Sequence, residues 1–278
     1  MSKTRETSEI VIAADRDDRH YWLDLWRFRE LFYFLAWRDV LVRYKQTLIG
    51  IAWSLLRPIL TMVIFTLVFS KLAKLPSGGA PYPLLVFSAM LPWHFFGSAI
   101  LDAGGSLIGG SNLLSKVYFP RLIVPASAMV AALLDFAISL VVLVALMLWY
   151  RHYPGIAVLA LPLFLLLVVT VAFGVGIWIA SLSVKYRDFQ FVAPFVLQAG
   201  LYLSPVGFSS AIVPADWRLL YSLNPLVGVI DGFRWALLGG THQVYLPGLV
   251  ASILTTSLIL VSGIWYFRRT ERFFADVV

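Results

Sequence analysis

Long apolar stretches separated by short polar segments run through most of the chain. The apolar stretches cover residues of about 48–70, 84–103, 122–149, 156–182, 189–208 and 246–267. A helix needs about 20 consecutive apolar residues to cross the hydrocarbon layer of a bilayer, and these stretches reach that length. The pattern predicts an all-α integral membrane protein with six transmembrane helices.

The segment before the first apolar stretch, residues 28–47, has an apolar stripe and a basic face. At helical spacing the stripe continues into the first stretch and consists of Trp37, Val40, Leu41, Tyr44 and Leu48, opposite Arg38, Asp39, Arg43, Lys45 and Gln46. Asp39 and Arg43 are four residues apart with the acid first, so we expect an ion pair along the helix. The segment predicts an N-terminal amphipathic interface helix. A solvated helix of a soluble protein is the alternative, which the uncharged stretch after Pro58 disfavours.

Residues 209–245, between the fifth and sixth stretches, are too apolar for a solvated loop. Asn224-Pro225 divides them and predicts two helical pieces, 214–223 and 226–238. Neither is long enough to cross a bilayer, so we expect re-entrant periplasmic helices, or helices lying flat at the interface. We predict a periplasmic gate there, formed by Pro214, Trp217, Asn224, Pro225 and Asp231. The alternative is an interfacial decoration without a gating role.

Composition and charge place the chain in a membrane. Hydrophobic residues make up 60% of it, charged residues 13%, and the mean hydropathy is +0.84, which is too apolar for a soluble core. Seventeen of the 22 Lys and Arg residues lie on the side that holds the N-terminus. The positive-inside rule then predicts that both termini are cytoplasmic, with a flexible tail (1–20) and a single transmembrane domain (21–278). The net charge of +7 therefore indicates no nucleic-acid partner.

Motifs for catalysis are missing from the sequence. It contains no G-x-x-x-x-G-K-[ST] phosphate-binding run and no cysteine, and its four histidines are scattered, so we expect no ATP site, catalytic residue or metal site in this chain. Uphill transport would then draw its energy from a partner or from an ion gradient. Asp102 and Asp135 lie within predicted spans, where carboxylates must face protein or water. We expect Asp135 to form a structural hydrogen bond between helices, with a substrate-path role or a proton relay as alternatives.

Three separated motifs carry a family resemblance. They are Arg-Asp-x-x-x-Arg-Tyr-Lys-Gln-Thr-x-x-Gly-x-x-Trp-x-x-x-x-Pro at 38–58, Lys-Val-Tyr-Phe-Pro-Arg at 116–121, and Phe-Arg-Arg-Thr-Glu-Arg-Phe-Phe-Ala-Asp at 267–276. Together they resemble the membrane (permease) subunits of bacterial ABC exporters for polysaccharides, the class that exports O-antigen, capsule and teichoic acid. The resemblance covers residues 28–278.

The resemblance implies partners and a coupling surface. Two copies of the chain would form the path, two separate ATPase subunits would bind ATP and Mg, and a lipid-linked polysaccharide, most of all O-antigen, would cross the bacterial inner membrane. The chain itself would hold no cofactor, and membrane lipid would surround it as a further partner. The residues implied to face the ATPase are Arg38, Asp39, Arg43, Tyr44, Asn112, Leu113, Lys116, Tyr118, Phe119 and Arg121.

Aromatic side chains recur within the predicted spans. Most are expected to pack or to face lipid, but uncharged rings would also suit a sugar polymer, because the C–H faces of sugars lie against rings without being pinned by charge. Candidates for such a path, beside Asp135, are Phe65, Phe69, Trp93, Phe96 and Tyr202.

Other functions fit parts of the pattern. An ABC permease for a drug or a small lipid would keep the same fold. An integral membrane acyl or glycosyl transferase would use His94 with Asp102 or Asp135, but it would need a polar cluster at one membrane face. A secondary transporter would need more acids within the spans.

Overall fold

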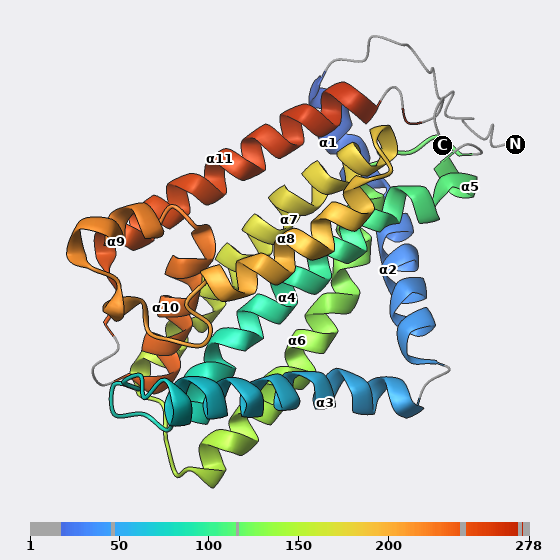
Figure 1. Cartoon of the computed structure of the whole chain (residues 1–278). Helices are drawn as coiled ribbons and strands as arrows, with labels where there is room; N and C mark the ends of the chain where they lie inside the picture. The colour runs from blue at the N-terminus through green and yellow to red at the C-terminus, as the bar shows by residue number, and fades with distance from the viewer. Residues whose placement is uncertain (1–17, 46–47, 115–116, 240–242, 272–273, 275–278) are drawn as a thin grey trace, which may run out of the picture.

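The computed structural model describes residues 18–45, 48–114, 117–239, 243–271 and 274. Within them the regular elements are helices, which confirms the all-α prediction for this part of the chain (Figure 1). In chain order they are α1 (Asp18–Arg27), α2 (Arg29–Tyr44), α3 (Leu48–Phe65), the π-helix η1 (Thr66–Leu72), α4 (Tyr82–Gly109), α5 (Ser111–Leu114), α6 (Ile123–Trp149), η2 (Ile156–Ala160), α7 (Leu161–Lys185), α8 (Phe189–Leu203), η3 (Ser210–Ile212), α9 (Ala215–Tyr221), α10 (Pro225–Leu238) and α11 (Leu246–Thr270).

Among the described residues, four helices are long and apolar enough to cross a membrane: α4, α6, α7 continued from η2, and α11. They coincide with the predicted stretches 84–103, 122–149, 156–182 and 246–267. The two other predicted stretches correspond to α3 with its extension η1, and to α8, which has 15 residues. α8 ends at Leu203, earlier than predicted. Pro205 disfavours helical geometry at the residue before it, Ser204, which is extended.

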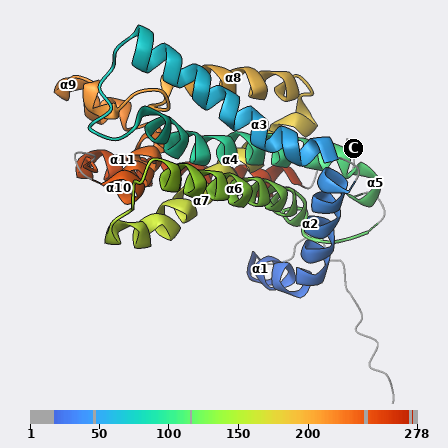
Figure 2. The same cartoon turned by 90° about the horizontal axis from the view of Figure 1, so that it is seen from below.

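α4 forms the centre of the bundle. Figure 2 shows α3 and α8 on one side of it and α6 and α7 on the other. Most of its side chains are accordingly buried, at positions that run from Leu84 to Leu107. Glycines bring α7 and α11 together, because a Cβ on Gly263 would lie 2.8 Å from the carbonyl oxygen of Gly174. Small residues at such positions let membrane helices pack backbone to backbone.

The two ends of the bundle hold different elements. α9 and α10 lie at one end, and α1, α2 and α5 lie at the other (Figure 1). A hydrophobic cluster separate from the main core joins α2, α7, the start of α6 and the end of α11. Its buried members are Leu35, Leu107, Phe119, Leu122, Ile123, Val124, Ile177, Ala180, Val184, Phe267 and Phe274.

The amphipathic segment 28–47 contains the helix α2, and a shorter helix, α1, precedes it. α1 begins at Asp18, inside the predicted tail, and α2 packs on α6. The stripe that α2 buries contains Leu35 and Ala36, whereas Trp37, from the predicted apolar face, is 53% exposed. Trp37 therefore stays outside the bundle, α2 packs on the bundle through other apolar residues, and the place of the predicted stripe at the membrane surface stays a prediction.

The division of residues 209–245 into two short helices is confirmed. Asn224 caps α10, since its Oδ1 accepts a hydrogen bond from the backbone N–H of Leu226 at 3.1 Å. Pro225 occupies the first turn of α10, where its missing N–H costs nothing. α10 is enclosed by α4, α7 and α11, so it does not lie flat on the surface of the chain.

Candidate functional site

Arg234 anchors α10 at its end of the bundle. Its side chain is fully buried, and its guanidinium donates to three carbonyl oxygens at 2.8–3.2 Å, those of Leu85, Val206 and Phe208. Tyr82 of α4 donates its hydroxyl hydrogen to the carbonyl of Gly207 at 2.7 Å. Three consecutive carbonyls of the loop after α8 are therefore held by α10 and α4.

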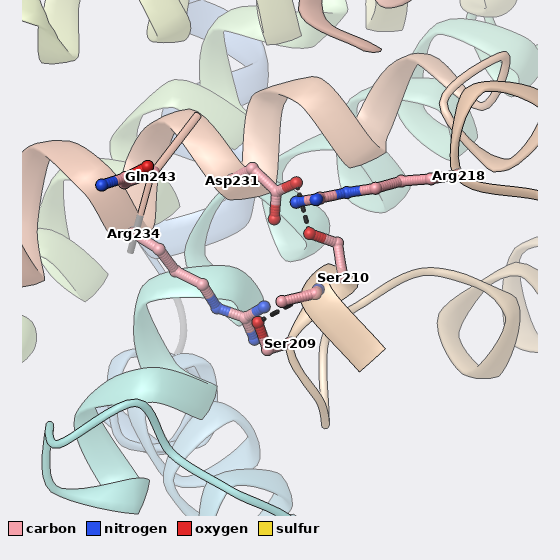
Figure 3. Close-up of a pocket in the computed structure, with 7 residues that line it drawn as sticks. Ser209, Ser210, Arg218, Asp231, Arg234 and Gln243 are labelled. Carbon is pink, nitrogen blue, oxygen red and sulfur yellow. Dashed lines mark hydrogen bonds between the residues drawn. The ribbon is translucent and has the colours of Figure 1, made fainter. Parts of the chain in front are cut away.

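A pocket of about 210 Å³ opens beside Arg234 (Figure 3). Within it, Ser210 donates to Oδ2 of Asp231 at 2.6 Å, and the guanidinium of Arg218 lies next to the same carboxylate. Arg218 also lies over the ring of Tyr245, 4.6 Å from its centre. The complete lining is Ser209, Ser210, Ala211, Arg218, Asp231, Arg234 and Gln243.

The predicted gate residues have different surroundings. Asp231 lines the pocket, and Asn224 links α10 to the end of α8 by donating to the hydroxyl of Ser204 at 3.0 Å. Trp217 and Pro214 are exposed. The sequence interpretation missed Arg234 and Tyr82, although a lone arginine within the apolar residues 226–238 was the available signal, because such a charge must find partners.

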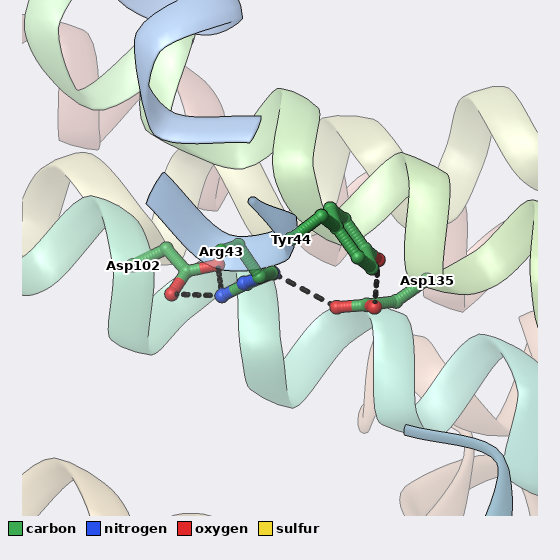
Figure 4. Close-up of polar contacts among 4 residues, drawn as sticks. All are labelled: Arg43, Tyr44, Asp102 and Asp135. Carbon is green, nitrogen blue, oxygen red and sulfur yellow. Dashed lines mark hydrogen bonds and ion pairs between the residues drawn. The ribbon is translucent and has the colours of Figure 1, made fainter. Parts of the chain in front are cut away.

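A second polar site joins α2 to two spans. Arg43, near the end of α2, lies between Asp102 of α4 and Asp135 of α6 (Figure 4). Its Nη2 is 2.8 Å from both oxygens of Asp102, and its Nη1 is 2.8 Å from Oδ2 of Asp135. The hydroxyl of Tyr44 donates to the other oxygen of Asp135 at 2.5 Å. We call these four residues the Arg43 cluster.

The Arg43 cluster pairs the carboxylates of the two spans with a cation. The side chains of Arg43, Asp102 and Asp135 are each between a quarter and a third exposed, and carboxylates within membrane helices require partners. Burial by itself lowers the pKa of Arg43, but the carboxylates of Asp102 and Asp135 raise it above its ordinary value. One cation thus serves two acids on different helices, with the Tyr44 hydroxyl filling a remaining acceptor site.

The cluster corrects one prediction and agrees with another. The ion pair expected between Asp39 and Arg43 is replaced, because Arg43 turns to the partly buried carboxylates and Asp39 pairs with the neighbouring Arg38 at 2.8 Å. Asp135 is hydrogen-bonded between helices, as the structural interpretation expects. Its role on a substrate path stays a prediction.

A cavity of about 270 Å³ adjoins the Arg43 cluster. α2, α3, α4 and α6 line it with Arg43, Tyr44, Arg57, Pro58, Leu91, His94, Phe95, Ser98, Asp135, Phe136 and Ser139. The Nε2 atom of His94 is buried there without a hydrogen-bond partner among the described residues. An unsatisfied polar atom in a polar cavity is a site for bound water. His94 and Asp135, two of the residues named for the transferase alternative, both line this cavity.

The residues predicted to face an ATPase divide into exposed and buried groups. Arg38 and Tyr118 are exposed, the latter by 54%. Phe119 is 4% exposed, and Arg121 donates to the backbone carbonyl of Glu271. Leu113 is half-buried, and the side chains of Asn112 and Lys116 lie outside the described residues. Within residues 117–121 the exposed Val117 and Tyr118 are thus followed by the anchored Phe119 and Arg121.

The candidate path aromatics gather around α3, α4 and α8. The rings of Phe65 and Phe69 are 5.4 Å apart, those of Phe65 and Tyr202 are 6.2 Å apart, and those of Trp93 and Phe96 are 5.8 Å apart. Phe65, Trp93 and Phe96 are buried, whereas Tyr202 is exposed. None of the five lines the cavity beside Arg43, so their role as a path lining stays a prediction.

Comparison with known proteins gives consistent matches. The chain is 25% identical over 243 residues to the O-antigen export system permease protein RfbA of Klebsiella pneumoniae, an alignment that covers 87% of this chain and 92% of that protein. It is 26% identical to RfbA of Myxococcus xanthus over 76% of this chain and 81% of that protein. It is 23% identical to the polysialic acid transport protein KpsM of Escherichia coli over 84% and 91%. The family profile described as "ABC-2 type transporter" matches residues 30–238. The chain is therefore a membrane protein that belongs to the ABC-2 type transporter family.

Proposed function

We propose that this chain is the transmembrane permease subunit of an ATP-driven exporter that moves a lipid-linked polysaccharide, most of all O-antigen, across the bacterial inner membrane. The observation that carries the proposal is the near full-length similarity to permeases named for O-antigen export and for polysialic acid transport. The membrane family and the four long apolar helices support it.

The proposed topology has six spans. α3 with η1, and α8, complete the four long helices, and the re-entrant pair α9–α10 lies at the periplasmic end. α1, α2, α5 and the end of α11 share the opposite end (Figure 1), where the excess of Lys and Arg supports a cytoplasmic location of both termini. Two copies would enclose the path, because six helices from one chain leave little room for a polymer.

In the proposed mechanism a separate ATPase, holding ATP and Mg, pushes on α2 and on residues 117–121. The Arg43 cluster supports this route, since α2 is tied by charge-assisted hydrogen bonds to α4 and α6. A displacement of α2 then either moves these two spans or breaks the cluster. α10 is held by Arg234 at the other end. The movement would therefore open the path around α10, while α10 itself would stay in place.

A deletion and complementation experiment in the source bacterium tests the cargo. Loss of the gene should remove the polysaccharide from the cell surface and leave the lipid-linked polymer on the cytoplasmic side of the inner membrane, and the wild-type gene should restore export. Drug sensitivity measured in the same strains addresses the rival. A deletion that changes drug sensitivity while surface polysaccharide stays normal would favour a drug or small-lipid permease instead.

A further inference from the structure

Residues Phe267, Glu271 and Phe274, which we call the closing part of the chain, lie against residues 117–121, which we call the coupling segment. Arg121 donates to the backbone carbonyl of Glu271, 150 positions away. The carboxylate of Glu271 is itself held, because it accepts from the hydroxyl of Tyr21 at 3.0 Å and from the guanidinium of Arg268 at 2.9 Å. Arg268 in turn lies 3.5 Å from the centre of the Tyr21 ring. One residue therefore ties α1, the end of α11 and the coupling segment together.

A buried aromatic layer lies beside these polar contacts. The rings of Phe267 and Phe274 meet edge to face with centres 5.4 Å apart, and both side chains are buried. Phe119 of the coupling segment belongs to the same hydrophobic cluster, as does Leu35 of α2. The coupling segment is thus seated on the closing part of the chain by an apolar side chain and by a hydrogen bond.

The outward side of the coupling segment has a different character. Val117 and Tyr118 are both about half exposed, while Phe119 and Arg121 hold the segment from behind. Surface loops are usually mobile, whereas close-packed groups transmit strain. A partner that contacts the exposed pair would therefore push on a supported surface.

We propose that Glu271, with the buried pair Phe267 and Phe274, is a positioning element that makes the coupling segment move with α1 and α11 as one body. Phe267, Glu271 and Phe274, which belong to the sequence motif at 267–276, would then have a function in coupling as well as in packing. The proposal rests on the proposed function, because the partner that pushes on the segment is the ATPase.

The first test measures the mobility of the coupling segment in the purified chain. The sequence contains no cysteine, so Val117→Cys introduces a single site for a nitroxide label. Glu271→Ala keeps the backbone carbonyl that accepts from Arg121 but removes the carboxylate held by Tyr21 and Arg268. The carbonyl is then no longer fixed in place, so the mobility of the label should increase in its electron paramagnetic resonance spectrum. Glu271→Gln, which keeps a side-chain acceptor, should preserve part of the immobilisation. Glu30→Ala, at an exposed glutamate of α2, is the matched control and should leave the spectrum unchanged.

A label on folded Glu271→Ala protein that is as immobile as in the wild type would overturn the proposal. Should this variant fail to fold, Tyr21→Phe, which removes a single hydroxyl group, replaces it with the same interpretation.

The second test uses the complex with its ATPase in proteoliposomes. Glu271→Ala should lower the polymer exported per ATP hydrolysed by about fivefold, while ATPase retention and ATP hydrolysis stay at wild-type levels. Unchanged export per ATP would contradict the positioning role. Failure of the wild-type chain to retain an ATPase would count against the proposed function instead, and the label experiment on the chain alone would still decide the positioning proposal.

Discussion

Arg43 and Asp135 stand 92 positions apart in the sequence, yet their side chains meet at 2.8 Å. The contact joins an interface helix, α2, to a membrane span, α6, and the same guanidinium reaches Asp102 on α4. Carboxylates within membrane helices need a partner, and here both carboxylates pair with the same cation. The stability of the two spans and the position of α2 are therefore linked.

Arg43→Met should destabilise the chain more than Asp135→Asn does. The first change leaves two carboxylates together without a cation, at an expected cost of about 3 kcal/mol, whereas the second keeps Arg43 paired with Asp102 and costs about 1 kcal/mol. Thermal unfolding in detergent measures both. The triple variant Arg43→Met, Asp102→Asn, Asp135→Asn should regain part of the loss, and Arg38→Met at an exposed pair should change little. Equal losses for Arg43→Met and Arg38→Met would contradict the assignment.

Arg234→Met should be among the most damaging single substitutions in the chain. It leaves the carbonyls of Val206 and Phe208 without this donor, whereas the carbonyl of Leu85 still accepts from the hydroxyl of Ser88. Unsatisfied buried acceptors cost about 1–3 kcal/mol each. We expect a sharp drop in the yield of folded protein and a lower unfolding temperature. Arg187→Met, at an exposed arginine, controls for loss of charge alone, and comparable yields of the two variants would refute the anchoring role.

Gly263→Ala should separate α7 from α11. The added Cβ would meet the carbonyl oxygen of Gly174 at 2.8 Å, and a backbone atom cannot turn aside as a side chain does. We expect a loss of about 1–3 kcal/mol in unfolding free energy. Gly105→Ala, where the new Cβ meets nothing within 4 Å, should be neutral or slightly stabilising because alanine favours helix. Similar stability of both variants would show that α7 and α11 pack more loosely.

Glu271 should give the stability of the chain a defined pH dependence. Burial raises the pKa of this carboxyl above its ordinary value, against the opposing effect of the neighbouring Arg268. An acid whose pKa is raised in the folded state adds stability below its unfolded pKa and loses that contribution as the pH rises through the folded value. The unfolding temperature of the wild type, relative to Glu271→Gln, should therefore fall as the pH rises above the ordinary glutamate pKa of about 4.3. A rise over this range would mean that Arg268 and Tyr21 outweigh burial.

Much of the fold could be predicted because a helix that crosses lipid must be apolar over about 20 residues. Every long apolar stretch became a helix, and the Asn224-Pro225 step divided α9 from α10 as expected, since a cap followed by proline is a local signal. The end of α8 was misplaced because the apolar stretch continues past Pro205, and hydropathy alone does not register where a helix must stop.

The candidate sites were harder to predict because their contacts are long-range. Spacing along α2 suggested Asp39 as the partner of Arg43, and only the packing of α2 on α6 shows that Asp135 is nearer to the guanidinium. Likewise, periodicity identified an apolar stripe containing Trp37 but could not say which of two stripes faces the bundle. The partners of Arg234 are backbone carbonyls, which leave no trace in residue types.

Nucleotide hydrolysis, measured on the chain alone and together with its partner, decides whether this permease depends on a separate ATPase for its energy. The purified chain in nanodiscs should neither bind nor hydrolyse ATP, and addition of the ATPase subunit expressed with it should produce hydrolysis together with polymer export. Hydrolysis by the chain in the absence of any partner would contradict the account.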